Sequence, residues 1–166
     1  MSNTQHNYDI AILGGGCTAL NFAMAYAQTQ SDKKVLILEA RDHYIHDRNW
    51  SFWLSRNDEF EHRDIIKKTW NSWNFSSEAK TYTHQSNIYE YATIASSDFY
   101  KKANMAIKHD KRQTIIMGCT VQKIAQNQKH KIQTTKGTFQ AQKIIDARNK
   151  NQNRYEGQAS YYQIFN

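Results

Sequence analysis

Residues 14–19 read GGGCTA, and this stretch decides the fold. An apolar run, YDIAIL at Tyr8–Leu13, stops at the glycines as a buried parallel strand does. Residues 18–28 then carry small and apolar residues at helical spacing, and a second apolar run, KVLIL, follows at Lys34–Leu38. The order strand, glycine turn, helix, strand predicts a compact βαβ unit and places the chain in the α/β class.

The glycine turn fits the pattern G-x-G-x-x-A, and each position of that pattern has a physical task. Gly14 permits a tight turn, Gly16 lets a pyrophosphate approach the backbone, and Ala19 allows the helix to pack closely on the strand. Cys17 and Thr18 lie on the first helical turn, where their backbone N–H groups and the positive end of the helix dipole attract phosphate.

Glu39 stands at the end of the second predicted strand, where a carboxylate accepts hydrogen bonds from the ribose of an adenosine. A glycine turn alone is a weak signal, because such turns also serve simple chain reversal. Together with the small-residue helix, the second strand and the terminal acid, it predicts a dinucleotide site. The alternative is a structural turn beside an ordinary exposed glutamate.

The rest of the pattern favours FAD over NAD as the dinucleotide. A meander of short antiparallel strands is predicted before a closing parallel strand, and such an inserted sheet is usual in FAD-binding proteins. A helix capped by Ser97–Asp98 precedes them, and residues 40–95 are expected to form loops, short helices and short strands. The predicted ranges are 97–109 for the helix, 113–117 for a buried strand, 119–124, 131–135 and 138–141 for the meander, and 143–146 for the closing strand.

Residues 47–53, DRNWSFW, concentrate rigid aromatic surface in a polar chain. Three interpretations are open: protein core, a platform for nucleic acid, or the wall of a small-molecule site. We expect Trp53 to fill core or to pack beside a flavin. For Trp50, packing and a ligand wall are equally open.

The composition is that of a globular domain, with 39% apolar and 22% charged residues among 166. The formal net charge is +7, but the cations are scattered and no run of five like charges occurs, which argues against a nucleic-acid-binding arm. A polar N-terminus and the lack of an apolar run near ~20 residues indicate a soluble or membrane-peripheral protein. Cys17 and Cys119 lack metal-binding spacing and are expected to be free thiols in a reducing cytoplasm.

Histidines and an acidic segment offer weaker candidates. His43 and His46 have a spacing that suits chelation, but no third ligand is specified, so no metal site is predicted. A mixed-charge patch that we expect to be solvated is formed by Arg56, Asp58, Glu59, Glu61, His62, Arg63 and Asp64.

Several segments of the chain match, in order, those of a known family. They are YDIAILGGGCTALNFAMAYAQ, VLILEA, DRNWSFW, KKTWNSWNF, YATIASSDFY, KIIDAR and YYQIFN. Across them the chain resembles the N-terminal part of the lycopene cyclases, the FAD-dependent carotenoid cyclase family. The glycine turn is shared by many flavoproteins, whereas RNWSFW followed by KIIDAR and YQIF is specific to this family. Two departures are Asn49, where the family commonly has threonine, and Ala19 at the third glycine position.

The resemblance implies a two-part flavoprotein with a Rossmann-like, glutathione-reductase-type FAD-binding domain that contains an inserted antiparallel β-meander. It assigns residues 1–148 to that domain, with 40–95 as an irregular aromatic-rich insertion, and 149–166 to the start of an incomplete substrate or cap segment. It implies a non-redox reaction of the intramolecular lyase or isomerase type. Reduced FAD supports protonation of a linear carotene end, and the carbocation closes to a ring and loses a proton. NAD(P)H is the expected reductant.

The resemblance also implies which partners and locations to expect. A lycopene-like carotene is the expected substrate, and the protein is expected in the cytoplasm with peripheral contact at the inner face of the membrane, without a nucleic-acid partner. The chain covers less than half of a typical cyclase, so the acid that protonates the carotene is expected beyond Asn166. We therefore expect no cyclase activity from this chain alone, and a separate C-terminal half is a candidate partner.

Site residues are carried over from the family by position, with no metal among them. Trp50 is a candidate wall for the polyene or its cation. Arg48 would approach the flavin or the pyrophosphate, Val121 would place backbone near the adenine, and Asp146 would lie near the ribityl–pyrophosphate region. The residues expected to hold the ADP half are Gly14, Gly16, Cys17, Thr18 and Glu39.

Two other functions stay open on the sequence. One is a flavin-dependent monooxygenase or oxidoreductase that uses the same FAD half for redox chemistry. The other is a non-catalytic dinucleotide-binding remnant.

Overall fold

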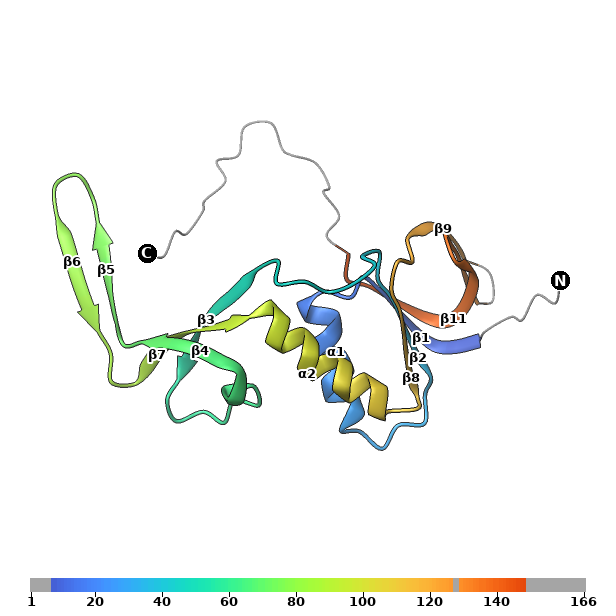
Figure 1. Ribbon diagram of the computed structural model, residues 1–166, viewed down its shortest axis with the longest axis horizontal. Coiled ribbons are helices and arrows are strands. Elements are labelled where there is room, and N and C mark those ends of the chain that lie inside the picture. Colours follow the sequence, from blue (N-terminus) through green and yellow to red (C-terminus); the bar gives the residue numbers. More distant parts are fainter. Residues whose placement is uncertain (1–6, 127–128, 149–166) are drawn as a thin grey trace.

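The computed structural model describes residues 7–126 and 129–148, and its centre is a six-stranded sheet (Figure 1). The strand order is β8-β2-β1-β11-β10-β9. The first four of these strands pair in parallel, and the last three pair antiparallel. The bounds are β1 Asn7–Leu13, β2 Val35–Leu38, β8 Gln113–Ile116, β9 Val121–Gln126, β10 His130–Thr134 and β11 Gly137–Asp146.

Strand β11 is one continuous strand that contains two segments predicted as separate strands, residues 138–141 and 143–146. Its first half pairs antiparallel with β10, as at Ile132 and Phe139, and its length from Gln140 onward pairs in parallel with β1. No glycine or turn residue interrupts it after Gly137, so the backbone continues in one extended run. The separate closing strand was therefore a wrong prediction, and the antiparallel strands extend the parallel sheet itself.

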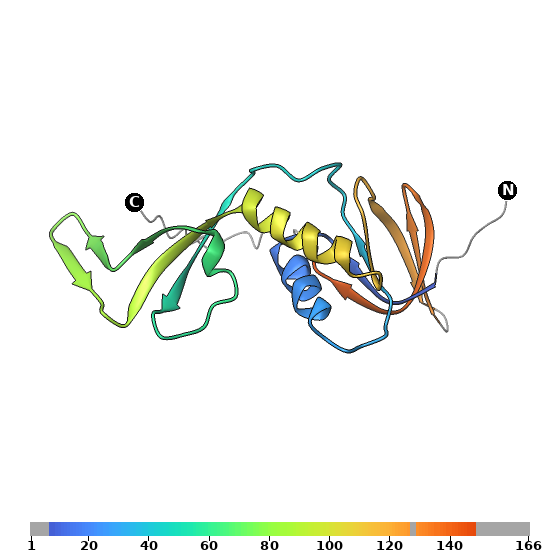
Figure 2. The same cartoon turned by 60° about the horizontal axis from the view of Figure 1, so that its bottom comes forward.

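Helices α1 (Cys17–Ala27) and α2 (Ser96–His109) lie side by side and cover one face of this sheet (Figure 2). Alternate residues of β1 face opposite ways, as a strand requires. Ile12 joins the core beneath the helices, whereas Ala11 and Leu13 join a second core on the other face. The predicted βαβ unit is thus confirmed. Its helix fits closely on the sheet because the face it presents is built of small and apolar residues, among them the fully buried Ala19, Leu20 and Ala23.

Helix α2 begins at Ser96, with Ala95 as its N-cap and no side-chain cap hydrogen bond. The predicted cap by Ser97–Asp98 is therefore wrong. The Asp98 carboxylate instead forms an ion pair with Lys67, a residue distant in sequence, and does not cap the helix.

Residues 40–95 form a second, smaller sheet and a hairpin, and β7 leads directly into α2. The three-stranded sheet has the order β3-β7-β4, and β5 pairs with β6. In Figure 1 the β5–β6 hairpin projects from the end of the molecule opposite β9. The bounds are β3 Asn49–Ser55, β4 Ile66–Trp70, β5 Ser72–Ser76, β6 Thr81–Gln85 and β7 Tyr89–Ala95, with a 3-10 turn at Arg63–Ile65.

The aromatic run of β3 divides between the two faces of the small sheet, because side chains alternate along a strand. Trp50 is partly buried, with ring centroids 5.1 Å from Phe99 and 5.5 Å from Tyr100. Trp53, three residues on, points to the other face, is 45% exposed and packs against Trp73. The expectation that Trp53 fills core is therefore wrong.

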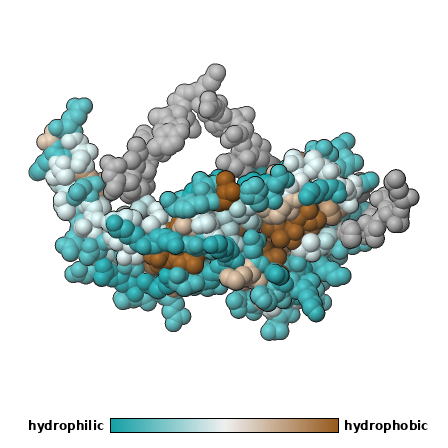
Figure 3. Space-filling model, in the orientation of Figure 1, coloured by the Kyte–Doolittle hydropathy of each residue, from teal (hydrophilic) through white to brown (hydrophobic). Residues whose placement is uncertain are grey.

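The surface is mostly hydrophilic on the face shown in Figure 3, with apolar areas set between polar ones. That distribution agrees with a chain of 39% apolar residues and a net charge of +7. Within the part of the chain that the structure describes, no helix has the length and apolarity needed to cross a membrane.

Candidate functional site

The glycine turn between β1 and α1 begins at Gly14, whose backbone φ of +93° lies in the left-handed region. The Gly14 N–H donates to the carbonyl of Leu38, at a distance of 2.8 Å, and so ties the turn to the end of β2. A Cβ on Gly14 would lie 3.3 Å from the backbone of Ala147. Both the conformation and the close approach of β11 require glycine here, which confirms its predicted role in the turn.

Gly15 is fixed from both of its peptide groups. Its N–H donates to Glu39 Oε2 at 2.6 Å, and its carbonyl accepts hydrogen bonds from the Tyr44 hydroxyl at 2.8 Å and from Arg41 Nη2 at 3.2 Å. A Cβ on Gly15 would lie 2.5 Å from the Tyr44 oxygen, so this position has no room for a side chain. The second glycine therefore serves packing inside the protein.

Gly16 differs from its two neighbours because a Cβ there would meet no atom within 4 Å among residues 7–126 and 129–148, apart from the adjoining residues of the chain. It is the N-cap of α1 in an extended conformation, with no side-chain cap hydrogen bond and no acidic residue in the first helical turn. The first intrahelical hydrogen bond runs from the Leu20 N–H to the Gly16 carbonyl, at 3.0 Å. The positive end of α1 thus faces open space, which is the geometry that binds anions.

A groove of about 370 Å³ runs past this helix end. It brings together five residues predicted from the sequence, and two further arginines, Arg41 and Arg148, also line it. The selected residues that line it are Gly14, Gly16, Glu39, Arg48 and Val121.

Glu39 is 6% exposed and lines this groove, and both of its carboxylate oxygens accept hydrogen bonds. Oε1 accepts from the Arg41 N–H at 2.8 Å and from Arg41 Nε at 3.1 Å. Oε2 accepts from Gly15 and from Arg41 Nη2. Burial alone would raise the pKa of Glu39, but the hydrogen bonds from Arg41 and Gly15 hold it below its usual value, so the carboxylate is charged.

Arg41 is the centre of a wider network at the mouth of the groove. Its Nη1 also donates to Asp47 Oδ2 at 3.2 Å and to the Tyr100 hydroxyl at 3.1 Å. Its guanidinium carbon lies 4.9 Å from the centre of the Tyr44 ring, and that ring stacks on Tyr100 with centroids 4.1 Å apart. These contacts hold the cation beside Glu39 and raise its pKa further above the usual arginine value, although burial opposes the rise.

The two remaining arginines of the groove are paired with aspartates. Arg48 is exposed and its Nε contacts Asp47 Oδ2 at 3.2 Å. Asp146, at the end of β11 beside Leu13, accepts from Arg148 Nε at 2.8 Å and from Arg148 Nη2 at 2.7 Å. Asp146 therefore borders the groove through Arg148, whose side chain lines it.

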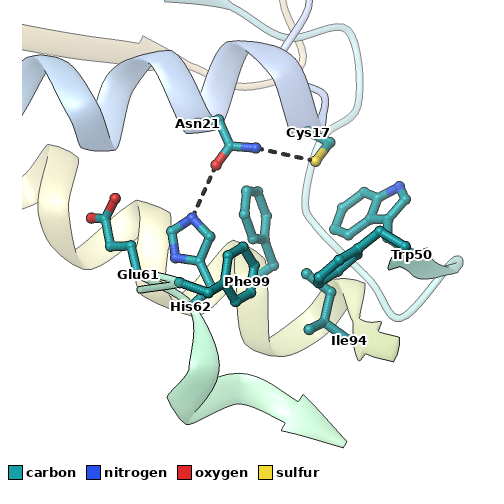
Figure 4. Close-up of a pocket in the computed structure, with 9 residues that line it drawn as sticks. Cys17, Asn21, Trp50, Glu61, His62, Ile94 and Phe99 are labelled. Atoms are coloured by element: carbon teal, nitrogen blue, oxygen red, sulfur yellow. Dashed lines mark hydrogen bonds between the residues drawn. The ribbon is translucent and has the colours of Figure 1, made fainter. Parts of the chain in front are cut away.

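Cys17 and Thr18 lie on the first turn of α1, as expected, but neither is among the residues that line this groove. Thr18 is exposed, and Cys17 lines a different cavity of about 320 Å³, in which burial raises the pKa of its thiol. That cavity is shown in Figure 4, with Trp50 and Phe99 among its walls. The N-terminal turn of α1 thus has the groove on one side and an aromatic cavity on the other.

His62 was expected in a solvated patch, and that expectation is wrong. It is 6% exposed and lines the aromatic cavity, where its Nε2 lies 3.0 Å from Asn21 Oδ1 (Figure 4). The charged neighbours of His62 in the sequence do remain exposed, so only the imidazole turns inward. No sequence signal distinguishes it from them, because its burial depends on α1 and on Phe99.

The described residues contain no group of three or more histidine, cysteine, aspartate or glutamate side chains arranged to hold a metal ion. His43 and His46 are exposed in the loop before β3. The groups that the site offers a ligand are thus amides, arginines and a carboxylate.

The fold is similar to that of several solved structures at low sequence identity. For p-nitrophenol 4-monooxygenase PnpA from Pseudomonas putida DLL-E4 the TM-score is 0.64 at 11% identity, covering 86% of this chain and 41% of that chain. For a geranylgeranyl bacteriochlorophyll reductase-like protein from Thermoplasma acidophilum the TM-score is 0.61 at 16% identity, covering 86% of this chain and 39% of that chain. For halogenase PltM, solved with phloroglucinol and FAD, the TM-score is 0.59 at 16% identity, covering 85% of this chain and 34% of that chain.

These likenesses show a mixed α/β fold of the kind found in FAD-binding proteins, and this chain spans about two fifths of the length of the first two proteins. Comparison with curated protein sequences found no match. The sequence profile described as "Lycopene cyclase protein" matches residues 9–166.

Proposed function

The chain belongs to the lycopene cyclase family, and from this premise we propose that it binds FAD in the groove beside Gly16 and Glu39. The observation that carries the proposal is the free space at Gly16. The turn needs Gly14 for its conformation and Gly15 for its packing, but no contact among the described residues requires the third glycine. A ligand that approaches the helix end closely would explain why this position is glycine.

The charges around the groove suit the ADP half of FAD. Gly16 and the uncapped amides of α1 would receive the pyrophosphate, with Arg48 and Arg148 close enough to offset its negative charge. Val121, half-buried at the start of β9, would border the adenine.

Glu39 can accept a hydrogen bond from the ribose if one of its present donors is replaced. Each of its oxygens already accepts two hydrogen bonds, which is about the capacity of a carboxylate. A ribose hydroxyl would therefore replace a donor of Arg41 at Glu39. Arg41 keeps partners when this happens, because Asp47 and the Tyr100 hydroxyl already accept from its Nη1.

For the complete protein we propose the non-redox cyclisation of a carotene end. Bound reduced FAD would supply electron-rich support for protonation of the linear end. Protonation forms a carbocation, a carbon–carbon bond then closes the ring, and loss of a proton leaves an isomer of the starting carotene. The described residues contribute cofactor binding: the turn fixes the pyrophosphate, Glu39 orients the adenosine, and Trp50 remains the predicted wall for the polyene. NAD(P)H as the reductant and a peripheral membrane contact belong to the same proposal.

FAD binding is tested by a substitution that separates binding from folding. Gly16→Asp places a preferred N-cap residue on α1 and so preserves or raises stability, but it puts a negative charge where the pyrophosphate would lie. We expect FAD affinity to fall at least tenfold, measured by quenching of flavin fluorescence, with an unchanged or higher thermal midpoint. Asn57→Asp adds the same charge at an exposed turn and serves as the control. Equal FAD affinity in Gly16→Asp and the unmodified chain would refute the proposed site.

The reaction is tested separately, with the coding frame extended past Asn166 as far as it runs. Cells that accumulate lycopene should convert it to a cyclic isomer of the same mass, seen by chromatography and mass spectrometry. NAD(P)H oxidation coupled to oxygen consumption, without ring formation, would instead support the flavin oxidoreductase alternative.

A further inference from the structure

A cavity between helix α2 and the loop of residues 42–46 shares no lining residue with the proposed FAD groove or with the aromatic cavity beside α1. It encloses about 360 Å³, which is within the size range of small-molecule sites. Its walls come from that loop, from the N-terminal half of α2, and from Met117, which follows β8. No step of the proposed function uses this cavity.

One part of the cavity wall is apolar. Tyr100 is 2% exposed, and its ring stacks on that of Tyr44 with centroids 4.1 Å apart. The Tyr44 hydroxyl donates to a carbonyl of the glycine turn at 2.8 Å, and the Tyr100 hydroxyl donates to Asp47 Oδ1 at 3.1 Å. Because both hydroxyls have partners elsewhere, the two tyrosines offer mainly hydrocarbon to the cavity, as Ile45 and Met117 do.

The rest of the wall carries polar side chains from one face of α2. Ser97, Lys101 and Asn104 are spaced by four and three residues, so they lie on the same side of the helix. Within the part of the chain that the structure describes, none of these three side chains has a hydrogen bond or an ion pair. His43 and His46 line the same cavity from the loop. All five residues can donate hydrogen bonds to a ligand.

The lysines of this region differ in whether they have an anionic partner. Lys67 forms an ion pair with Asp98 at 2.5 Å, and Lys102 forms one with Asp64 at 2.6 Å. Lys101, which lines the cavity, has no carboxylate within ion-pairing distance among the described residues. A bound anion would give Lys101 the partner that the other two lysines already have.

The one carboxylate among the described lining residues is offset by a further lysine. Asp42 Oδ1 occupies the space where a Cβ on Gly118 would stand, and Lys136 Nζ would lie 3.3 Å from the same Cβ. Lys136 Nζ also donates to the Met117 carbonyl at 2.7 Å, which holds the ammonium at this end of the cavity. The charge of Lys101 therefore remains without compensation.

We propose that this cavity binds a small aromatic carboxylate, with its carboxylate at Lys101 and its ring against the tyrosines and Met117. An ammonium with hydrogen-bond donors beside it favours a carboxylate, and a wall of tyrosine rings and a thioether favours an aromatic ring. The inference rests on this cavity alone and goes beyond the proposed binding of FAD.

Benzoate and its uncharged amide, benzamide, are the matched probes, and the methionine methyl groups report where they bind. With methyl-labelled methionine, benzoate should shift the NMR signal of Met117 saturably, with a dissociation constant of about 1–10 mM for a ligand of this size. The buried Met24 and the exposed Met105 should not respond. Benzamide should bind about three- to tenfold more weakly, because it lacks the charge.

Two exposed lysines of α2 provide the matched variants. Lys101→Gln should lower the affinity for benzoate to that for benzamide, whereas Lys108→Gln, outside the cavity, should leave it within about twofold. Equal affinity for benzoate and benzamide, equal losses in the two variants, or no saturable shift at Met117 would each overturn the proposal. Inorganic phosphate that bound as tightly as benzoate would also overturn it, because the ring would then contribute nothing. FAD binding in the groove without benzoate binding here would leave the proposed function standing.

Discussion

The Arg41 guanidinium donates one hydrogen bond to each carboxylate oxygen of Glu39, with Nε–Oε1 at 3.1 Å and Nη2–Oε2 at 3.2 Å. Since Glu39 also accepts from the Gly15 N–H, its carboxylate links the glycine turn to the residues that follow β2. The residue expected to recognise a ribose is thus also a structural part of the turn. Substitutions at this pair should therefore affect stability even without a ligand.

Replacing Arg41 by methionine keeps most of the side-chain stem and removes the charge. The folded-state pKa of Glu39 is lowered, so its stabilising effect is present above its ordinary value of 4.5 and is lost as pH falls through the folded value. In Arg41→Met, burial without the guanidinium should raise the pKa of Glu39 and reduce the free energy of unfolding at neutral pH by about 1–3 kcal/mol. Urea unfolding and carboxyl NMR titration measure the two effects. An unchanged pKa of Glu39 would show that the backbone N–H groups of residues 15 and 41 hold the charge without the guanidinium.

The first and third glycines of the turn should respond differently to alanine. Gly14→Ala forces a side chain to a φ of +93° and brings Cβ to 3.3 Å from Ala147, so we expect a loss of about 1–3 kcal/mol in unfolding free energy. Gly16→Ala has neither problem and should lose less than about 1 kcal/mol, from its weaker N-capping. Chemical denaturation of the two variants side by side gives the comparison. Equal losses would mean that the space beside Gly16 is filled in solution.

An ion pair far from the groove should control stability in acid. Hydrogen bonds from Arg112 lower the pKa of Asp110 to about 2, although burial opposes the shift. Arg112 also donates to the carbonyl of Thr29 at 2.9 Å, just beyond the end of α1. The stabilisation from Asp110 is present above its ordinary pKa of 3.8 and is lost as pH falls toward about 2.

Asp110→Asn should therefore lower the thermal midpoint at neutral pH, and the gap to the unmodified chain should narrow as pH falls below about 4. Thermal unfolding over this pH range measures the difference in thermal midpoint, and Asp32→Asn at an exposed position is the control. A gap of constant size at all pH values would assign the effect to lost packing instead of lost charge.

The parts of the site that the sequence could predict are those fixed by the chain's own order. A glycine turn after a strand, and an acid at the end of the next parallel strand, must meet at the same edge of the sheet, and Gly15 and Glu39 do meet there. Local order and strand direction were sufficient for this pair. Val121 and Arg48 were instead expected from the family resemblance, and both line the groove.

What the sequence could not predict depends on contacts between distant elements. Arg41 and Tyr44 lie in an irregular segment, and their roles follow from Tyr100 on α2 and from the Gly15 carbonyl. His62 has charged neighbours on both sides, and its burial follows from its contacts with Asn21 of α1 and with Phe99 of α2. Each of these residues is polar, so hydrophobic periodicity contains no information about its position.

Arg48 offers a test that separates charge recognition from adenosine recognition. Its side chain is 60% exposed and lines the groove with Gly14 and Gly16, so its removal leaves the core intact. A pyrophosphate at the helix end would be attracted by its charge, whereas an adenosine without phosphates would not. Arg48→Gln should therefore weaken ADP binding about three- to tenfold and leave adenosine binding unchanged, as measured by calorimetry.

The difference between Arg48→Gln and the unmodified chain should shrink as salt is raised toward 1 M, since salt screens an exposed charge. Arg56→Gln removes an exposed cation that follows β3 and lies outside the groove, and it should not change ADP binding. If both variants lost ADP affinity to the same extent, the general positive charge of the chain would be the cause, and Arg48 would have no specific place at the pyrophosphate. If adenosine binding fell together with ADP binding, Arg48 would act through the shape of the loop before β3, which its ion pair with Asp47 helps to hold.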